Sequence, residues 1–524
     1  MRGAWGAAGD ALAVVSDCGA IREIWKDYWF TKDNESAVAA ALHGGCDFEC
    51  GGTFNDYVVK ALDRGDIVLA DLQQAARRML RLAFRAGMLD PVERQLPYLS
   101  LNAESVDTPQ SRQLAFEAAV QSIVLLQNRA PPAKASAQPL LPLRSGALRR
   151  LAVVGPNANV TATLLGSYHG ENRLVTNQSV LAALQRRGAR DGFGVAFAPG
   201  CANISCADAS GFAAATAAAA GADAAVVVLG LCSDDCPGGD VDGGVSEGEG
   251  KDRPSTDLPG LQEQLLRAVV GTGTPTVLLL VHGGPLSIDW PAANVDAILS
   301  IVYPGEFGGD AAAAILFGDA SPSGRSTMTW YSTEWQKQRP FIVDMGLAPR
   351  VGVLGEVVTG VTYLYANASL VLYPFGTGES YARFSFAWSD GGAPRALSAR
   401  ELVAAPPSFE VNVTNIGSVA SDVSALAFVS SGAPGEPAHK CFDFARASAL
   451  APGASALLVF TLPPDVAATV SAEGEQAVVP GAYAVRVGEL SRELVVTGVE
   501  GVVLFDMPAV RRSAGQASFP RRKY

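Results

Sequence analysis

Thr276-Val-Leu-Leu-Leu-Val281 is an apolar run that decides the fold of the middle of the chain. A run that is apolar at nearly every position is typical of a strand buried on both faces of a parallel sheet. The same pattern recurs at Leu151–Gly155, Val195–Phe197, Ala225–Leu229 and Ala297–Val302, and segments of helix length separate the runs. Residues 106–345 are therefore predicted to form an α/β domain whose mainly parallel sheet has helices on both faces.

The residues that precede this domain, 1–105, alternate between strand-like and helical patterns. Ala11–Val15 and Cys46–Cys50 are candidate strands, and Ser36–His43 is a candidate helix. A longer helix is predicted from apolar residues at helical spacing with a glycine at the end, namely Leu72, Ala76, Met79, Leu80, Ala83 and Gly87. The segment is predicted to hold two strand-and-helix units.

The stretch Phe212–Leu231 is rich in Ala and Val and has the length of a membrane span. However, Asp223 lies in its middle, and Gly221 and Gly230 interrupt it. A charge at the centre of a bilayer is costly. We therefore expect no membrane span here, but a buried helix that leads into the buried strand at Ala225–Leu229.

Beyond Pro374 the helical periodicity ends and short alternating strands follow. The candidates are Phe409–Val413, Ala425–Val429, Leu457–Thr461, Tyr483–Val487 and Leu494–Val496. Residues 401–498 are predicted to form a small β-sandwich. Residues 346–400 are expected to be a linker, and residues 499–524, which are basic and without periodicity, a disordered tail.

Composition narrows the class of ligand. The chain has 40 Lys and Arg against 52 Asp and Glu residues, so it offers no basic surface for nucleic acid or anionic lipid, and a neutral polar ligand suits it better. Its four histidines are scattered at 43, 169, 282 and 439, which predicts no zinc site. The segment Val153–Ala158 lacks the spaced glycines of a nucleotide-binding turn, and no cofactor is expected.

Two acidic features could perform chemistry. Asp17 lies where a strand-like run gives way to a helical stretch, an edge at which α/β folds place reactive groups, although an acidic residue there is more often a helix N-cap. The second feature is Ser246-Glu-Gly-Glu-Gly-Lys-Asp-Arg253, a type of loop that is usually solvated surface. Glycoside hydrolysis needs two carboxylates, one as nucleophile and one as acid and then base, which suggests a role for the pair.

Three segments, Val14-Val-Ser-Asp-Cys-Gly-Ala-Ile21, Ala41-Leu-His-Gly-Gly-Cys-Asp-Phe-Glu-Cys-Gly51 and Arg85-Ala-Gly-Met-Leu-Asp90, resemble the nucleophile region of glycoside hydrolase family 3. The resemblance is closest to the β-xylosidase and α-L-arabinofuranosidase branch, where Cys follows the nucleophilic Asp. It continues in order through Val153–Asn159, Glu249–Arg253, Gly283–Pro285, Tyr303–Gly305 and Tyr373–Gly378. It covers nearly the whole chain and includes a terminal fibronectin type III-like domain.

This resemblance implies a retaining exo-glycosidase that releases terminal xylose, or arabinose, from xylo-oligosaccharides through a covalent glycosyl-enzyme. Asp17 would be the nucleophile. Glu249 would be the acid/base because it precedes Asp252 by three residues, as in the form Glu-Gly-x-Asp-Arg, and Glu247 is the alternative. A β-glucosidase remains an alternative specificity, and a non-catalytic carbohydrate-binding or cell-surface protein is the alternative from another class.

The resemblance also implies a disulfide between Cys18 and Cys50. Close spacing suggests two further local bridges, Cys201–Cys206 and Cys232–Cys236, and leaves Cys46 and Cys441 without a predicted partner. The candidate N-glycosylation sites are Asn34, Asn159, Asn177, Asn203, Asn367 and Asn412. Together these features point to an extracellular or cell-wall protein, although the first residues do not have the layout of a signal peptide.

In the family, the nucleophile belongs to the seventh strand of a (β/α)8-type barrel. Only about sixteen residues precede Asp17 here, so residues 1–105 would be the last two strand-and-helix units of that barrel. Two strands cannot close a barrel. We therefore expect the sequence to be an N-terminally truncated form of the family, or the degenerate product of a duplicated gene.

Overall fold

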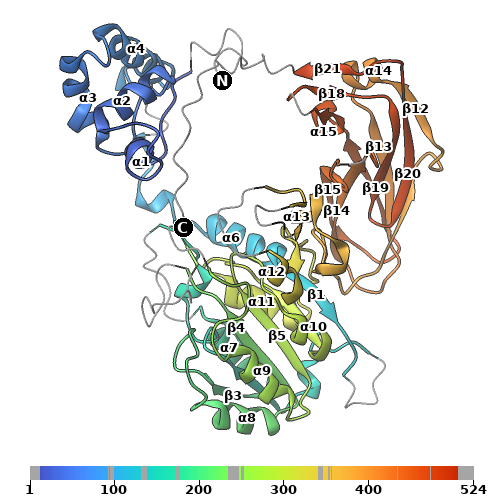
Figure 1. Cartoon of the computed structure of the whole chain (residues 1–524). Helices are drawn as coiled ribbons and strands as arrows, with labels where there is room; N and C mark the ends of the chain where they lie inside the picture. Colours follow the sequence, from blue (N-terminus) through green and yellow to red (C-terminus); the bar gives the residue numbers. More distant parts are fainter. Residues whose placement is uncertain are drawn as a thin grey trace. The chain divides into compact units, whose positions relative to one another are not determined.

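The computed structural model describes residues 12–92, 94, 99–131, 138–170, 178–233, 247–248, 253–339, 346–351, 355, 357–433, 435–471 and 474–505. The chain divides into two compact units, residues 1–109 and 110–524 (Figure 1). Each unit is described by itself below.

The described part of the first unit is helical. Its helices are α1 (Ala20–Lys26), α2 (Asn34–His43), α3 (Thr53–Arg64) and α4 (Leu69–Arg85), and a 3-10 turn follows at Ala103–Ser105. Val38 and Ala39 of α2 pack with Ala61 of α3 and with Ile67 in a small buried core. The helices predicted around residues 36–43 and 72–83 are thus present as α2 and α4.

The two strands predicted in this unit are not formed. In the described residues they are reduced to one parallel bridge between Val15 and Phe48, and Ala11 lies outside the described part. A parallel pair without neighbouring strands leaves most of its backbone groups unpaired, which explains why the pairing does not extend. Residues 46–50 instead form a loop that follows α2.

The second unit begins with an α/β region built on a six-stranded sheet in the order β1-β6-β5-β4-β2-β3. The neighbours from β6 to β3 are parallel, and β1 pairs with β6 antiparallel. The strands are β1 (Val124–Asn128), β2 (Arg150–Val154), β3 (Gly194–Ala198), β4 (Ala224–Gly230), β5 (Thr276–Val281) and β6 (Ala297–Ser300). The mainly parallel sheet is confirmed, whereas β1 was not predicted.

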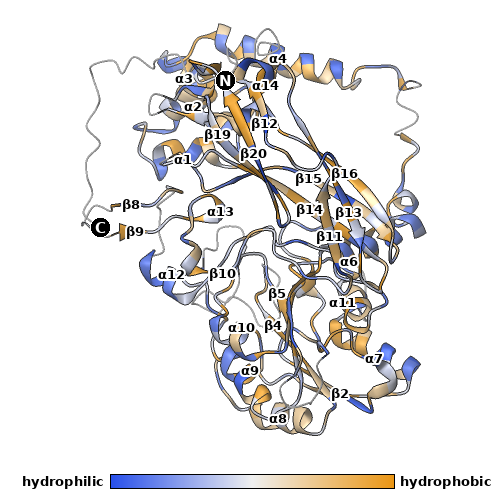
Figure 2. Cartoon of the chain, turned by 90° about the vertical axis from the view of Figure 1, so that its right-hand side faces the viewer, coloured by the Kyte–Doolittle hydropathy of each residue, from blue (hydrophilic) through white to orange (hydrophobic). Residues whose placement is uncertain are grey.

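Helices cover both faces of this sheet (Figure 1). One buried cluster joins the sheet to α6 (Pro109–Ser122), α7 (Val180–Asp191) and α11 (Gly308–Phe317), and a second joins it to α8 (Phe212–Ala220), α9 (Gln262–Val270) and residues around α10 (Asp289–Asn294). Figure 2 shows β4 and β5 largely in the hydrophobic colour, whereas α7 and α9 carry hydrophilic residues. Every residue of β4 and β5 is buried, which is why their sequences are apolar throughout.

The stretch Phe212–Leu231 forms α8 followed by the buried strand β4, as predicted, but the helix itself is not buried: only Ala215 and Ala219 of α8 are, because the helix packs on the sheet with one side. No helix among the described residues is long and apolar enough to cross a membrane. The other short elements of the region are 3-10 turns at Ser145–Ala147, Ala162–Leu164 and Ala368–Leu370, helices α12 (Thr333–Gln338) and α13 (Thr362–Tyr365), and strand pairs β7 (Trp330–Tyr331) with β10 (Val371–Tyr373) and β8 (Arg350–Val351) with β9 (Val357–Val358).

The rest of the second unit consists mainly of two β-sheets, of three and five strands, that share one buried core. The first holds β11 (Phe384–Trp388), β13 (Ser408–Asn415) and β16 (Ser455–Thr461), and the second holds β12 (Arg395–Ser398), β14 (Ser421–Ser430), β15 (Lys440–Leu450), β19 (Gly481–Val487) and β20 (Leu490–Thr497). Buried and half-buried residues alternate along β14, as expected of a strand with one face on the core. Helices α14 (Ala399–Ala404) and α15 (Pro464–Ala467) flank the sheets.

Two expected boundaries of the sandwich were wrong. Residues 346–400 are not a plain linker, because β11 and β12 belong to its two sheets. The tail expected from residue 499 begins later, because β21 (Val502–Phe505) pairs with β18 (Gln476–Val478), which also pairs with β17 (Thr469–Val470). β12 and β21 are only four residues long and depend on neighbouring strands for their hydrogen bonds, whereas the alternating aromatic residues of β11 are a strand signal that the sequence analysis missed. Residues 506–524 lie outside the described part.

Candidate active site

Asp17 lies in a short segment that two kinds of link attach to the loop after α2. The backbone N–H of Ser16 donates to the carbonyl oxygen of Phe48 over 2.9 Å. One residue beyond Asp17, Cys18 forms a disulfide with Cys50, and their Cα atoms are 4.3 Å apart. Asp17 itself is exposed. The segment is therefore held on both sides of a carboxylate that points to solvent.

The structure gives Asp17 no capping role at α1. The N-cap residue of that helix is Gly19, and no side chain caps the helix. The carboxylate of Asp17 accepts a hydrogen bond from the N–H of its neighbour Cys18 over 2.8 Å, while its backbone carbonyl accepts from Ala20 over 3.2 Å. The N-cap alternative is thus wrong, and the side chain is available to a ligand.

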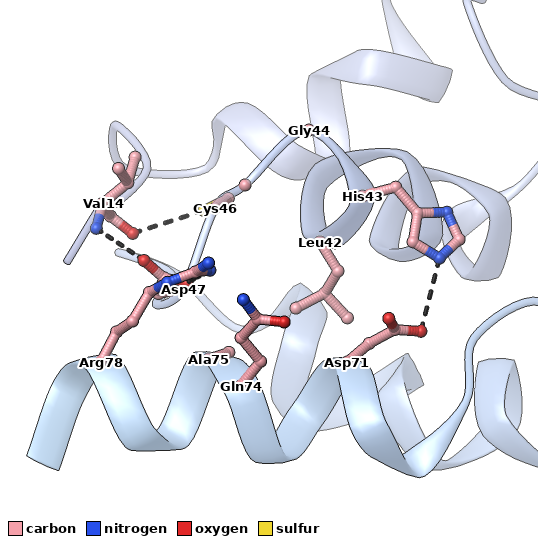
Figure 3. A pocket seen from close by; sticks show the side chains of 11 residues that line it. Val14, Leu42, His43, Gly44, Cys46, Asp47, Asp71, Gln74, Ala75 and Arg78 are labelled. Atoms are coloured by element: carbon pink, nitrogen blue, oxygen red, sulfur yellow. Dashed lines mark hydrogen bonds and ion pairs between the residues drawn. The ribbon is translucent and has the colours of Figure 1, made fainter. Parts of the chain in front are cut away.

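A pocket of about 460 Å³ in the same unit was not foreseen from the sequence (Figure 3). Arg78 reaches from α4 to Asp47 over 3.1 Å, and His43 faces Asp71 over 3.4 Å. The Asp47 carboxylate also accepts from the N–H of Val14 over 3.0 Å. The lining residues are Val14, Leu42, His43, Gly44, Gly45, Cys46, Asp47, Asp71, Gln74, Ala75 and Arg78. Asp47 thus connects Arg78 of α4 with Val14, which lies three residues before Asp17.

We expect Arg78→Ala to destabilise the first unit by about 3 kcal/mol, because it leaves the buried carboxylate of Asp47 without its cation. The two side chains are 13% and 1% exposed, so the Asp47 carboxylate depends on Arg78 for its counter-charge. Urea titration read by hydrogen exchange of peptides from residues 69–85 measures the loss. Arg77→Ala, an exposed position on the same helix, is the control and should change the midpoint little. Equal effects of the two substitutions would contradict the role of the pair.

The carboxylate of Glu247 is enclosed by hydrogen-bond donors from the second unit. The Tyr303 hydroxyl donates to Oε1 over 2.7 Å, and Arg253 Nε lies 3.1 Å from Oε2. The N–H of Gly283 donates to Oε1, and the N–H of Gly284 lies 3.2 Å from Oε2. Burial and the charge of Glu247 raise the pKa of Tyr303 well above its usual range, so the phenol stays a neutral donor. The arrangement holds the Glu247 carboxylate in one fixed orientation.

These partners come together because parallel strands end at one edge of the sheet. Gly283 and Gly284 follow β5, and Tyr303 follows β6, the neighbour of β5. Glu247 follows β4, on the other side of β5, and its N–H donates to the carbonyl of Cys232 over 3.1 Å. The carboxyl edge of a parallel sheet is where such folds place ligand sites.

His282 lies directly beneath this cluster and is completely buried. Its Nδ1 lies 2.8 Å from the carbonyl oxygen of Gly284, and its Nε2 lies 2.8 Å from the hydroxyl of Ser300. A carbonyl can only accept, so Nδ1 carries the hydrogen and Nε2 accepts from Ser300. The ring of Trp330 packs edge-on against the imidazole, with centroids 4.9 Å apart. Burial, which disfavours the charged imidazolium, lowers the pKa of His282 to about 4, and the positive charge of Arg253 acts in the same direction.

This shift predicts a pH dependence of stability. The pKa of His282 is 6.5 in the unfolded chain and about 4 in the folded one, so the unfolded chain binds the extra proton between these values. Stability is therefore lost as the pH falls from 6.5 to 4, by up to roughly 3 kcal/mol. Urea unfolding of wild type and His282→Gln at pH 7 and pH 4.5 tests this, with the exposed His169→Gln as control. A His282→Gln protein that keeps the full acid sensitivity would contradict the assignment.

The structure leaves some predicted site residues outside its described part. Glu249, Cys236 and Asn177 are among these. Cys201 and Cys206 form the expected kind of local disulfide, with Cα atoms 4.9 Å apart, whereas Cys46 and Cys441 are free thiols. Of the glycosylation candidates, three side chains are exposed and two are half-buried; these are Asn159, Asn367 and Asn412, and then Asn34 and Asn203. Asp17 and Glu247 belong to different units.

Sequence reasoning gave no role to Arg253, Tyr303, the Gly283–Gly284 turn or His282. The first three lie in segments that the family resemblance already includes, so their presence was visible but their contact with Glu247 was not. Among the described residues, no cluster of three or more His, Cys, Asp or Glu side chains could hold a metal ion.

Comparison with known proteins identifies the family of the chain. Residues 123–381 match the glycosyl hydrolase family 3 C-terminal domain. A probable exo-1,4-beta-xylosidase of Aspergillus terreus is 30% identical over 528 aligned positions, which cover 99% of this chain and 64% of that protein. A beta-xylosidase/alpha-L-arabinofuranosidase of Medicago sativa subsp. varia is 33% identical over 387 positions, which cover 73% of this chain and 45% of that protein.

A solved structure points the same way. It is that of a GH3 exo-beta-xylosidase in complex with a xylobiose aziridine activity-based probe, and it superposes with a TM-score of 0.82 at 25% identity, covering 96% of this chain and 63% of the other. The chain spans less than two thirds of the length of these relatives. The matched domain, the matched sequences and the matched fold agree. The chain belongs to glycoside hydrolase family 3.

Proposed function

We propose that this chain provides the catalytic carboxylates of a retaining exo-glycosidase that removes terminal xylose, or arabinose, from xylo-oligosaccharides. The observation that carries the proposal is the exposed carboxylate of Asp17, held between a backbone bridge and a disulfide. Two relatives that cover 99% and 96% of this chain, at 30% and 25% identity, are named xylosidases. Their names support xylose as the first substrate to test.

In the proposed reaction, Asp17 attacks the anomeric carbon of the terminal sugar while the glycosidic bond breaks. Glu249 donates its proton to the departing oxygen, which leaves as an alcohol, and a glycosyl ester of Asp17 forms. Glu249 then takes a proton from water, the resulting hydroxide attacks the same carbon, and Asp17 leaves as a carboxylate. Two inversions at one carbon retain its configuration.

The contacts of Glu247 support the choice of Glu249 as acid/base. A general acid must present its own hydrogen to the substrate and must later accept one from water. The oxygens of Glu247 are already engaged with Tyr303, Arg253 and the Gly283–Gly284 turn. Glu247 is therefore better suited to a structural role than to proton transfer: together with Arg253 it anchors the two ends of the segment 247–253.

Azide separates the two roles. With an activated aryl β-xyloside, Glu249→Ala should turn over faster when azide is added and should give the β-xylosyl azide, because azide replaces water without needing a base. Glu247→Ala should not be rescued in this way. If Glu247→Ala gives the β-azide and Glu249→Ala does not, the roles are reversed. A matched aryl β-glucoside in the same assay decides between xylose and glucose.

A non-catalytic carbohydrate-binding protein is the alternative function. Isothermal titration with xylotriose, combined with the aryl xyloside assay, separates the two. Binding without turnover favours the alternative, and turnover that Asp17→Asn abolishes favours the glycosidase.

We also propose an extracellular location. The disulfides Cys18–Cys50 and Cys201–Cys206 support it, since such bonds persist mainly in oxidising compartments. Expression in a secreting eukaryotic host, followed by mass spectrometry of the exposed Asn367 and Asn412, tests it. Unmodified asparagines, together with free thiols at Cys18, Cys50, Cys201 and Cys206, would argue against secretion.

A further inference from the structure

We propose that His282 is a positioning residue, which holds the Gly283–Gly284 turn in the orientation that clamps Glu247. The proposal deepens the function above and rests on it only for the catalytic consequence. The geometry itself involves described residues alone.

The Gly283–Gly284 turn makes hydrogen bonds to two different side chains, so its backbone must be held in one conformation for both to form. The N–H groups of Gly283 and Gly284 point to the carboxylate of Glu247, and the carbonyl of Gly284 points to His282 Nδ1 over 2.8 Å. Glycines lose more conformational freedom on ordering than other residues, so two in succession form a turn that is readily disordered. The hydrogen bond from His282 fixes the carbonyl of the peptide group that joins Gly284 to Pro285, directly after the two peptide groups whose N–H groups bond Glu247.

The imidazole is itself fixed from three sides. Ser300, at the end of β6, donates to Nε2 over 2.8 Å, and the ring of Trp330 packs against it edge-on. His282 directly follows β5, so its backbone continues a completely buried strand. A buried ring with both nitrogens engaged has one orientation and one tautomer, which makes it a rigid support.

The clamp has a consequence for the segment between Glu247 and Arg253. Arg253 Nε bonds the Glu247 carboxylate over 3.1 Å, and Arg253 Nη2 donates to the carbonyl of Pro285 over 3.0 Å. Both ends of the segment are therefore attached to the turn that His282 supports. If Glu249 is the acid/base, displacement of the turn also releases Glu247 and Arg253, the two fixed residues between which Glu249 lies in the sequence.

Three substitutions separate the two nitrogens of the ring. His282→Asn places an amide donor near the position of Nδ1, so it keeps the bond to Gly284 and loses the contact with Ser300. His282→Gln places its amide near Nε2 and does the reverse, and His282→Leu loses both. His439→Asn, at a half-buried histidine in the sandwich, is the matched control. Circular dichroism and thermal melting confirm that each variant is folded before it is compared.

The first measurement needs no activity. Hydrogen exchange of the peptide spanning residues 282–288 should be about tenfold faster in His282→Leu and His282→Gln, as expected for the loss of one hydrogen bond. It should stay close to wild type in His282→Asn and His439→Asn. Unchanged exchange in folded His282→Leu and His282→Gln overturns the positioning role, whether or not the chain is a glycosidase.

The second measurement tests the catalytic consequence. An acid/base out of place harms substrates with poor leaving groups, which need protonation, more than a dinitrophenyl xyloside, which does not. The ratio of kcat/KM for the two substrates should shift by about 10²-fold in His282→Leu and be restored in His282→Asn. An equal loss of kcat/KM on both substrates would indicate a merely structural role for His282 and would overturn the proposed catalytic consequence. Inactive wild type alongside the predicted exchange would refute the proposed function and leave the positioning role supported.

Discussion

Asp17→Asn is expected to lower the turnover of an aryl β-xyloside by at least about 10⁴-fold, since the loss of a nucleophile removes the covalent route altogether. The amide is isosteric, and the segment is held by the Cys18–Cys50 disulfide and the bridge of Val15 with Phe48, so the fold should not change. The measurement is steady-state release of the aryl alcohol by the whole chain. Thermal melting should give the same midpoint for variant and wild type.

The control is Asp27→Asn, which makes the same change of charge at an exposed position at the end of α1. It should retain full turnover. Asp17→Ala with azide adds a second readout, because the anion enters from the face that the carboxylate occupied and should give the α-xylosyl azide. Unaltered turnover in Asp17→Asn, or a β-azide from Asp17→Ala, would reject Asp17 as the nucleophile.

The second large effect concerns stability. Gly230→Ala should prevent the α/β region from folding, with a loss above about 4 kcal/mol, because the new methyl group meets backbone atoms that cannot move aside. Gly230 ends β4 with φ +138°, and a Cβ there would lie 1.9 Å from the carbonyl oxygen of Val281. The side chain of Gln262 also bonds both the N–H and the carbonyl of Gly230. Soluble yield and far-ultraviolet circular dichroism measure the effect.

Gly273→Ala is the matched control, because Gly273 also has positive φ, +78°, but a Cβ there would meet nothing within 4 Å. Its cost should be only about 1 kcal/mol, from the left-handed backbone alone. A folded Gly230→Ala protein with a midpoint like that of Gly273→Ala would show that the close approach of β4 to β5 is wrong.

Much of the fold could be predicted from local pattern. Thr276–Val281 is apolar at nearly every position because both faces of β5 are covered, and the helical spacing around Leu72–Ala83 matches α4. By contrast, β1 directly follows α6, and its short apolar run cannot be distinguished from a continuation of that helix. The strands expected at residues 11–15 and 46–50 failed because strand propensity requires neighbours to pair with.

The site divides in the same way. Asp17 is proposed because its neighbours form a recognisable motif, and its catalytic role stays a prediction, whereas the Cys18–Cys50 disulfide that the same resemblance implied is present. The donors around Glu247 could not, since Gly283 and Tyr303 are 36 and 56 residues away in sequence and meet it only because β4, β5 and β6 are adjacent. His282 had no signal at all, because one buried histidine is most often structural.

The most direct test of the account is to trap the glycosyl-enzyme. A 2-deoxy-2-fluoro-β-xyloside with a good leaving group slows both chemical steps but favours the first, so the ester accumulates. After peptic digestion, mass spectrometry should find the fluoroxylosyl group on the peptide that contains Asp17. A label on any other carboxylate, or a chain that hydrolyses xylosides without becoming labelled, would contradict the assignment of Asp17 as the nucleophile of a retaining glycosidase.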